Sequence, residues 1–195
     1  MASSINASLT AGIVQTADTS GNLNLQSGGT TIVAITSSGA AITGALSASG
    51  GVLGTTTNNN ASAGYVGEYI ESVVAADSVT AAANGVYKDL TSITLTAGDW
   101  DVTFLMDINN AGVAAILYGG GIGTATGTST TGLVIGSNFL YTGGTVSVGA
   151  NTGIAIPSYR ISIASTTTYY GKCVAYYPAG GPPKFGGRVS ARRVR

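Results

Sequence analysis

The clearest pattern in the chain is a run of alternating apolar and polar positions between residues 100 and 108. Large apolar residues at Trp100, Phe104 and Ile108 alternate with polar residues such as Asp101 and Thr103. Successive side chains of a strand point to opposite faces of a sheet, so this period of two predicts a half-buried β-strand. We expect the three apolar side chains to be buried and the two polar ones to lie on the opposite face.

Similar short apolar runs recur through the second half of the chain, and Gly, Asn or Pro separates most of them. Ile93 and Leu95 indicate a strand before a predicted turn at Gly98-Asp99. The other predicted strands are 65–75, 113–118, 133–141, 145–148, 159–164, 167–177 and 188–195. Many short strands at regular spacing, with no helical period between them, predict an all-β sandwich or jelly roll.

Residues 1–63 have a different pattern, with one charged side chain, Asp18, and no aromatic ring. Short strands are predicted where Leu23 and Leu25, and later Val33 and Ile35, alternate with polar or small residues. Ser-Gly steps at 20–21 and 38–39 form a weak internal repeat.

The apolar side chains of residues 1–63 are too few to offset the conformational entropy lost when so many residues become ordered. Disordered segments are usually rich in charge, which is nearly absent here. We therefore expect residues 1–54 to form an extended, β-repeat arm that becomes ordered against other chains. The polar stretch TTTNNNASAG, residues 55–64, is the predicted linker, and residues 65–195 are the predicted head.

Charge is scarce and unevenly distributed. Charged residues make up 8% of the chain, against about 25% in typical soluble domains. Residues 1–107 hold all eight acids and one base, a net charge of −7, whereas residues 108–195 hold seven bases and no acid, a net charge of +7. The two blocks complement each other within or between chains, or both are scattered surface charges.

Several kinds of catalytic and metal site are excluded by composition. The chain has no histidine and one cysteine, Cys173, so it lacks Ser-His and Cys-His arrangements, the usual zinc sites and an intrachain disulfide. The apolar residues around Cys173 indicate a buried thiol. The N-terminus has no signal-peptide pattern, and no apolar run is long enough to span a membrane, so we expect synthesis in the cytoplasm.

The remaining chemical candidates are weak. A glycosidase needs two carboxylates at a set separation. We interpret Asp99 as a turn residue and Asp101 as solvent-facing, and we expect Glu68 and Glu71 to point to opposite faces of a strand. A calcium-loop pattern that begins at Asp107 lacks the required Glu, and GIGTATG is followed by no predicted helix. We predict no enzyme, cofactor or metal site.

Aromatic and basic residues near the C-terminus are the candidate contact residues. They are Tyr169, Tyr170, Tyr176, Tyr177, Arg188, Arg192, Arg193 and Arg195. Exposed tyrosines could stack on sugar rings, or they could pack inside the fold or at an oligomer axis. The arginines could bind phosphates, or they could pair with carboxylates such as Asp101 or Asp107, within the chain or on a neighbouring copy.

Three segments carry a family resemblance. SITLTAGDWDVTFLMDI, YRISIASTTTYYGKCVAYY and the terminal RVSARRVR resemble the C-terminal jelly-roll domains of small tailed-bacteriophage virion proteins. Those domains are similar in build to the trimeric heads of the tumour-necrosis-factor and C1q group. The leader GNLNLQSGGTTIVAITSSG resembles the strand-turn repeats that precede such heads in phage fibres.

The resemblance implies a non-enzymatic homotrimer in the virion, with an N-terminal intertwined shaft or anchor and a distal trimeric jelly-roll head. The leading expectation is a short tail fibre or fibre tip that contacts the host surface, with a surface glycan as the candidate ligand. The alternative is a capsid decoration or head fibre on the shell. The expected partners are other virion proteins, through the arm, and nucleic acid is not expected. A polysaccharide-degrading spike is disfavoured by the lack of a plausible acid pair.

Overall fold

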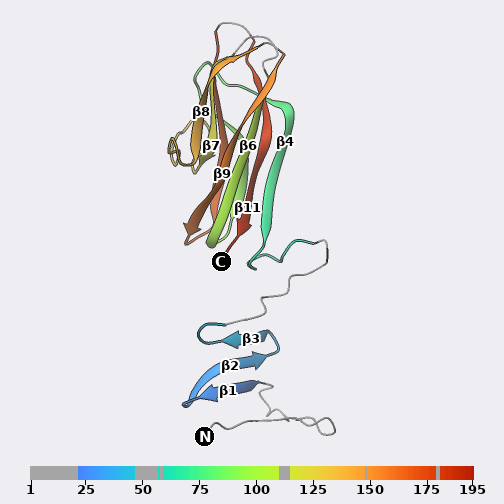
Figure 1. The fold of residues 1–195 in the computed structure, drawn as a ribbon, viewed down its shortest axis with the longest axis vertical. Coiled ribbons are helices and arrows are strands. Elements are labelled where there is room, and N and C mark those ends of the chain that lie inside the picture. Colours follow the sequence, from blue (N-terminus) through green and yellow to red (C-terminus); the bar gives the residue numbers. More distant parts are fainter. Residues whose placement is uncertain (1–21, 47–56, 58, 110–114, 148, 179–180) are drawn as a thin grey trace. The chain divides into compact units, whose positions relative to one another are not determined.

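The computed structural model describes residues 22–46, 57, 59–109, 115–147, 149–178 and 181–195. The chain divides into two compact units, Met1–Thr57 and Asn58–Arg195 (Figure 1). Eleven strands and no helix are found among the described residues, so the all-β prediction is confirmed. Residues 1–21 of the arm, including Asp18 and the first Ser-Gly step, lie outside the described residues.

The first unit contains a three-stranded antiparallel meander. Its strands are β1 (Leu23–Ser27), β2 (Thr30–Thr36) and β3 (Gly39–Ile42), in the order β1-β2-β3. Gly28 and Gly29 form the first two-residue turn with φ of 57° and 79°. Positive φ at both central positions is typical of the tight hairpin turns that match strand twist. The predicted strands around Leu23 and Val33 are confirmed.

The second unit is a sandwich of two four-stranded antiparallel sheets (Figure 1). Its strands are β4 (Tyr69–Thr80), β5 (Lys88–Leu95), β6 (Gly98–Asn109), β7 (Ala115–Gly123), β8 (Phe139–Val146), β9 (Asn151–Ile163), β10 (Thr167–Tyr176) and β11 (Lys184–Arg193). The sheet orders are β4-β11-β6-β9 and β5-β10-β7-β8. The chain changes sheet at most connections, which is the arrangement of a jelly roll and confirms the predicted fold class.

Strand β6 supplies the centre of the core. The side chains of Trp100, Phe104 and Ile108 are buried between the sheets, as predicted, and Asp101 and Thr103 point to the other face. The indole N–H of Trp100 donates a hydrogen bond to the Thr96 carbonyl at 2.9 Å. Thr167–Tyr176 and Lys184–Arg193 lie close to the strands predicted there, and Cys173 is buried in the core as expected.

Glycines in β7 explain the run GGGIG without any nucleotide site. A Cβ at Gly120 would lie 2.8 Å from the Phe104 ring on the core side. A Cβ at Gly119 or Gly121 would meet the Phe139 ring on the other side at 2.7 Å. The missing side chains therefore let aromatic rings pack against both faces of this strand.

Several predicted strand boundaries are wrong. The predicted strand 159–164 is the end of a longer strand, β9, which continues through Pro157. Proline is tolerated there because β9 is an edge strand, where a backbone N–H can be lost without breaking the ladder. The predicted strands 133–141 and 145–148 are corrected to one strand, β8. Residues 133–138 form turns, with Gly136 at φ 82°, and β8 runs through Gly143 and Gly144.

Three further predictions near strand starts are corrected. The strand predicted to start at residue 65 starts at Tyr69, because residues 62–68 form turns closed by the Tyr65 and Glu68 backbone N–H groups. Gly98 and Asp99 open β6 rather than forming a turn, so Asp99 is a strand residue. The strand predicted at 113–118 extends to Gly123, and its residues 113 and 114 lie outside the described residues.

Candidate functional site

The outer face of the β4-β11-β6-β9 sheet brings together side chains from distant parts of the sequence. Residues opposite each other in adjacent strands share a face. One row across the sheet is Tyr69, Arg192, Asp101 and Arg160. The next is Glu71, Ser190 and Thr103, and the third is Val73, Arg188, Leu105 and Ala155. We call these three rows the open face.

A shallow pocket of about 250 Å³ lies between the first two rows. It is lined by Tyr69, Asp101, Thr103, Ser158, Ser190, Ala191 and Arg192. The Thr103 and Ser190 hydroxyls hydrogen-bond each other at 2.8 Å. The Arg192 guanidinium carbon lies 5.6 Å from the centroid of the Tyr69 ring, within cation–π range. The pocket therefore offers one aromatic ring, both signs of charge and several hydroxyls, with no pair of carboxylates.

The third row of the open face is largely apolar and solvent-accessible. Val73 is 63% exposed and Leu105 is 47% exposed. Between them, the Arg188 guanidinium nitrogen lies 3.9 Å from the Glu71 carboxylate, and both side chains are exposed. An exposed ion pair of this length contributes little to stability. The row is suited to contact with another surface rather than to holding the sandwich together.

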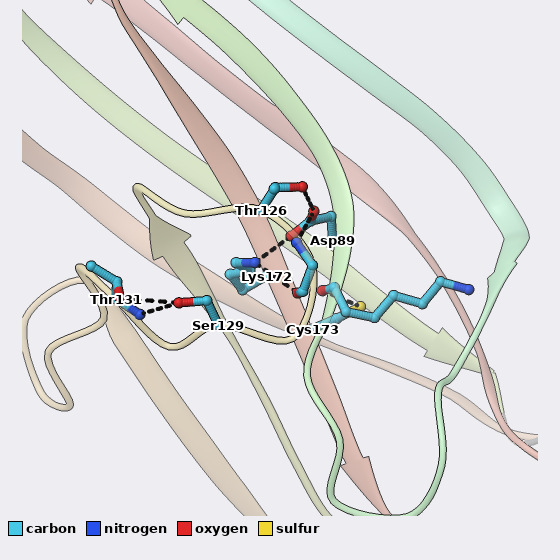
Figure 2. Close-up of polar contacts among 8 residues, drawn as sticks. Asp89, Thr126, Ser129, Thr131, Lys172 and Cys173 are labelled. Atoms are coloured by element: carbon cyan, nitrogen blue, oxygen red, sulfur yellow. Dashed lines mark hydrogen bonds and ion pairs between the residues drawn. The ribbon is translucent and has the colours of Figure 1, made fainter.

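Part of the outer face of the other sheet is covered by the chain itself. Cys173 points into the core, so Lys172 and Val174 point outward, yet both are buried. The segment 124–138 lies over Lys172. The Lys172 ammonium group donates hydrogen bonds to the Asp89 carboxylate and, at 2.9 Å, to the Gly127 carbonyl (Figure 2). This ion pair attaches the segment to the sheet.

Asp89 completes the attachment by accepting hydrogen bonds at 2.7 Å from the Thr126 hydroxyl and the Gly127 backbone N–H (Figure 2). Burial alone would raise the pKa of Asp89, but the hydrogen bonds from Lys172, Gly127 and Thr126 hold that pKa below its usual value. Asp89 is therefore ionised at neutral pH and compensates the buried lysine charge.

Aromatic residues cover another part of the same outer face. Phe139 is buried, and its ring centroid lies 5.7 Å from that of Tyr87 and 4.9 Å from that of Tyr141. The Tyr87 and Tyr141 hydroxyls hydrogen-bond each other, and Tyr176 lies beside Tyr141. The two sheets thus differ, because the chain covers part of one outer face and leaves the open face of the other uncovered by any described segment.

Arg193 differs from the other candidate arginines because it points inward. Its guanidinium lies 4.3 Å from the Trp100 ring centroid and donates to the Glu68 carboxylate at 2.9 Å and to the Ala97 carbonyl at 2.8 Å. Burial would raise the pKa of Glu68, but hydrogen bonds from the Gly64 N–H and Arg193 hold it below its usual value. Arg193 fastens the end of the chain to two loops and is a structural residue.

Asp99 is the acceptor for two other arginines. Its carboxylate is buried and lies 2.7 Å from a guanidinium nitrogen of Arg160 and 2.7 Å from one of Arg195. Hydrogen bonds from Ser162 and Arg160 lower the pKa of Asp99. Pairing of C-terminal arginines with acids was one of the two expectations, but the acids are Glu68, Glu71 and Asp99 and not Asp101 or Asp107.

The four candidate tyrosines do not form one surface. Tyr169 is buried in the core, and Tyr170 lies on the other side of β10 near Lys172. Tyr176 joins the aromatic residues beside β8, and the Tyr177 hydroxyl donates to the Ala82 carbonyl at 2.7 Å. Contact of any of them with a sugar stays a prediction.

The meander of the first unit also has one apolar face. Strand register places Leu23, Ile35 and Ala40 in one row, and Leu25, Val33 and Ile42 in the next. Asn24, Ala34 and Ala41 lie on the opposite face. Leu25 is 46% exposed and Ile35 is 41% exposed, and no described residue of the meander is buried.

Within the described ranges, no three His, Cys, Asp or Glu side chains lie close enough to hold a metal ion. Nor do these ranges contain a helix long and apolar enough to cross a membrane.

No protein-family model matches the sequence, and no curated protein matches it. Among solved structures, the chain is similar to one in the structure of infectious bursal disease virus Gx strain. The identity is 13% and the TM-score 0.45, covering 65% of this chain and 32% of that one. It is also similar to a chain in the crystal structure of the infectious bursal disease virus VP2 subviral particle, at 11% identity and TM-score 0.43, covering 65% and 33%. The chain spans about a third of the length of these proteins.

Proposed function

We propose that the chain is a non-enzymatic structural protein of a bacteriophage virion, assembled as a homotrimer. The arm attaches it to other virion proteins, and the jelly roll is the distal head. The leading role is a short tail fibre or fibre tip that contacts the host surface, with a surface glycan as the candidate ligand. A capsid decoration or head fibre on the shell is the alternative.

The observation that carries this proposal is the apolar face of the meander. A two- or three-stranded sheet is stable in water only when a hydrophobic face packs against something. In the meander, Leu25, Ile35 and their row partners stay exposed in the single chain. A meander with no charged residue and one exposed apolar face is suited to packing against other chains. This is consistent with the assembly that the resemblance to phage fibre leaders implies.

The sandwich supports the proposal that residues after the arm form a separate head, because the sandwich has a hydrophobic core of its own. Its buried core residues come from β5, β6, β7, β9, β10 and β11, in both sheets, and partly buried residues of β4 pack against them. A head that folds without the arm suits a fibre or decoration protein, in which the arm supplies attachment and the head supplies an exposed surface.

We expect a shortened chain, residues 58–195, to fold but to fail to join virions. The shortened chain starts at residue 58 because the second compact unit begins there. It then keeps Asn60, whose side chain hydrogen-bonds the backbone N–H and carbonyl of Tyr69. Circular dichroism should show β structure, and incorporation should be measured as copies per particle by quantitative immunoblot. Entry of the shortened chain at the normal copy number would contradict an anchoring arm and favour decoration through the head.

A matched pair of full-length variants tests the same point without a deletion. Leu25→Asp places a charge on the apolar face of the meander, whereas Asn24→Asp places the same charge on the opposite face. We expect Leu25→Asp to reduce incorporation strongly and Asn24→Asp to leave it close to normal. Equal incorporation of the two variants would mean that the apolar face is not the attachment surface.

A further inference from the structure

We propose that the open face of the β4-β11-β6-β9 sheet is the surface through which the heads of neighbouring copies contact each other. This inference rests on the proposed homotrimer and adds to it a specific surface in the head. The occupant is a second copy of this chain, with the apolar third row at the centre of the contact.

The first argument is the difference between the two outer faces of the sandwich. The segment 124–138 covers part of one outer face, and the Lys172 side chain beneath it is fully buried. On the other, no described segment covers Val73 and Leu105, although both are aliphatic and more than 40% exposed. Both belong to one row of the sheet with the charged side chains of Arg188 and Glu71 beside them, and exposed aliphatic residues with a polar rim are typical of an interaction surface.

The second argument is charge. Within the described residues, Asp101 and Asp107 form no ion pair, and neither does Arg192, which contacts the Tyr69 ring instead. All three project from the same side of the sheet as Leu105. A partner surface that also carries both signs could pair with them, and another copy of this chain has such a surface.

The third argument is the pocket beside the apolar row. Its volume of about 250 Å³ is below the roughly 300 Å³ at which pockets for drug-sized ligands begin. A hollow of this size can accept one side chain from a neighbouring copy, with hydroxyls, Asp101 and Arg192 as hydrogen-bond partners. The same chemistry could hold one sugar ring, so the experiment must distinguish a covered face from an accessible one.

Thiol labelling of the full chain makes this distinction. Burial raises the pKa of the native Cys173 to about 12, so that thiol should not react with maleimide at neutral pH. Leu105→Cys then introduces the reactive thiol on the open face. Ile135→Cys is the matched control, because Ile135 is 71% exposed on the segment that covers the other sheet. Labelling rates and sedimentation should be measured on the same samples.

In a trimeric sample, we expect Leu105→Cys to react more than about tenfold slower than Ile135→Cys, because labelling requires the interface to open. Similar rates in a trimeric sample would overturn the inference while leaving the trimer intact, and would leave the pocket open to a sugar. If the wild-type chain is monomeric and the Leu105→Cys variant reacts freely, the proposed homotrimer is overturned as well.

A charged substitution keeps the inference testable if the cysteine variant assembles poorly. In the full chain, Leu105→Arg should shift sedimentation from trimer toward monomer, whereas Ile135→Arg should not. Both chains should retain the same circular dichroism spectrum, because both positions are exposed in the single chain. A Leu105→Arg chain that stays trimeric would contradict the assignment of this face.

Discussion

Phe104→Ala should lower the free energy of unfolding by about 3–5 kcal/mol, through lost burial of the ring and the cavity that remains. The ring is fully buried and lies against two glycines. A Cβ at Gly120 would lie 2.8 Å from the ring, and one at Gly171 would lie 2.7 Å from it. Because neither glycine has a side chain that could move into the space, the cavity should collapse little.

Denaturant unfolding of the shortened chain 58–195 measures this effect without the arm. Val134→Ala is the control, because Val134 is 58% exposed and its loss should cost less than about 1 kcal/mol. If Phe104→Ala also costs less than about 1 kcal/mol, β6 does not present this face to the core.

Asp89→Asn should be comparably destabilising, by about 3–5 kcal/mol, because it leaves the Lys172 ammonium buried without a counter-charge. The Lys172 side chain is 0% exposed, and its acceptors are Asp89 and the Gly127 carbonyl. The double variant Asp89→Asn with Lys172→Met removes both charges and should recover much of the loss. A single variant as stable as wild type would show that segment 124–138 does not depend on this ion pair.

The Asp89–Lys172 ion pair also predicts that the stability of the head depends on pH. The folded pKa of Asp89 is below its unfolded value, so its contribution is fully present above about pH 4 and is lost as the pH falls through the folded pKa. Glu68 and Asp99 have pKa values lowered in the same direction. Melting temperature should therefore fall steeply below about pH 4, and the part that comes from Asp89 should be missing in Asp89→Asn. An identical acid profile for both chains would contradict the assignment to Asp89.

How much of the fold follows from the sequence depends on the strand. The alternation in β6 was sufficient to predict which side chains are buried, because one face of that strand packs in the core and the other does not. The pattern failed in β8 and β9. Glycines in β8 and Pro157 in β9 suggested chain breaks, yet both lie inside strands. An edge position tolerates the proline, and a sequence alone does not show which strands lie at an edge.

The open face shows a different limit. Arg192 is a candidate contact residue from the sequence, and Asp101 and Thr103 are predicted to face away from the core. Tyr69 and Ser190 have no predicted role. These residues meet because β11 lies between β4 and β6 in one register, and that register follows from long-range strand pairing. Arg193 illustrates the same point, since its neighbours Arg192 and Val194 are exposed while Arg193 itself points inward and contacts Trp100 and Glu68.

Sedimentation equilibrium of the full-length chain at micromolar concentration tests the central claim most directly, because the whole account depends on copies of the chain assembling with each other. The exposed apolar face of the meander and the open face of the head both predict association, and the proposed homotrimer predicts a mass of three chains. A stable monomer at that concentration would contradict the account.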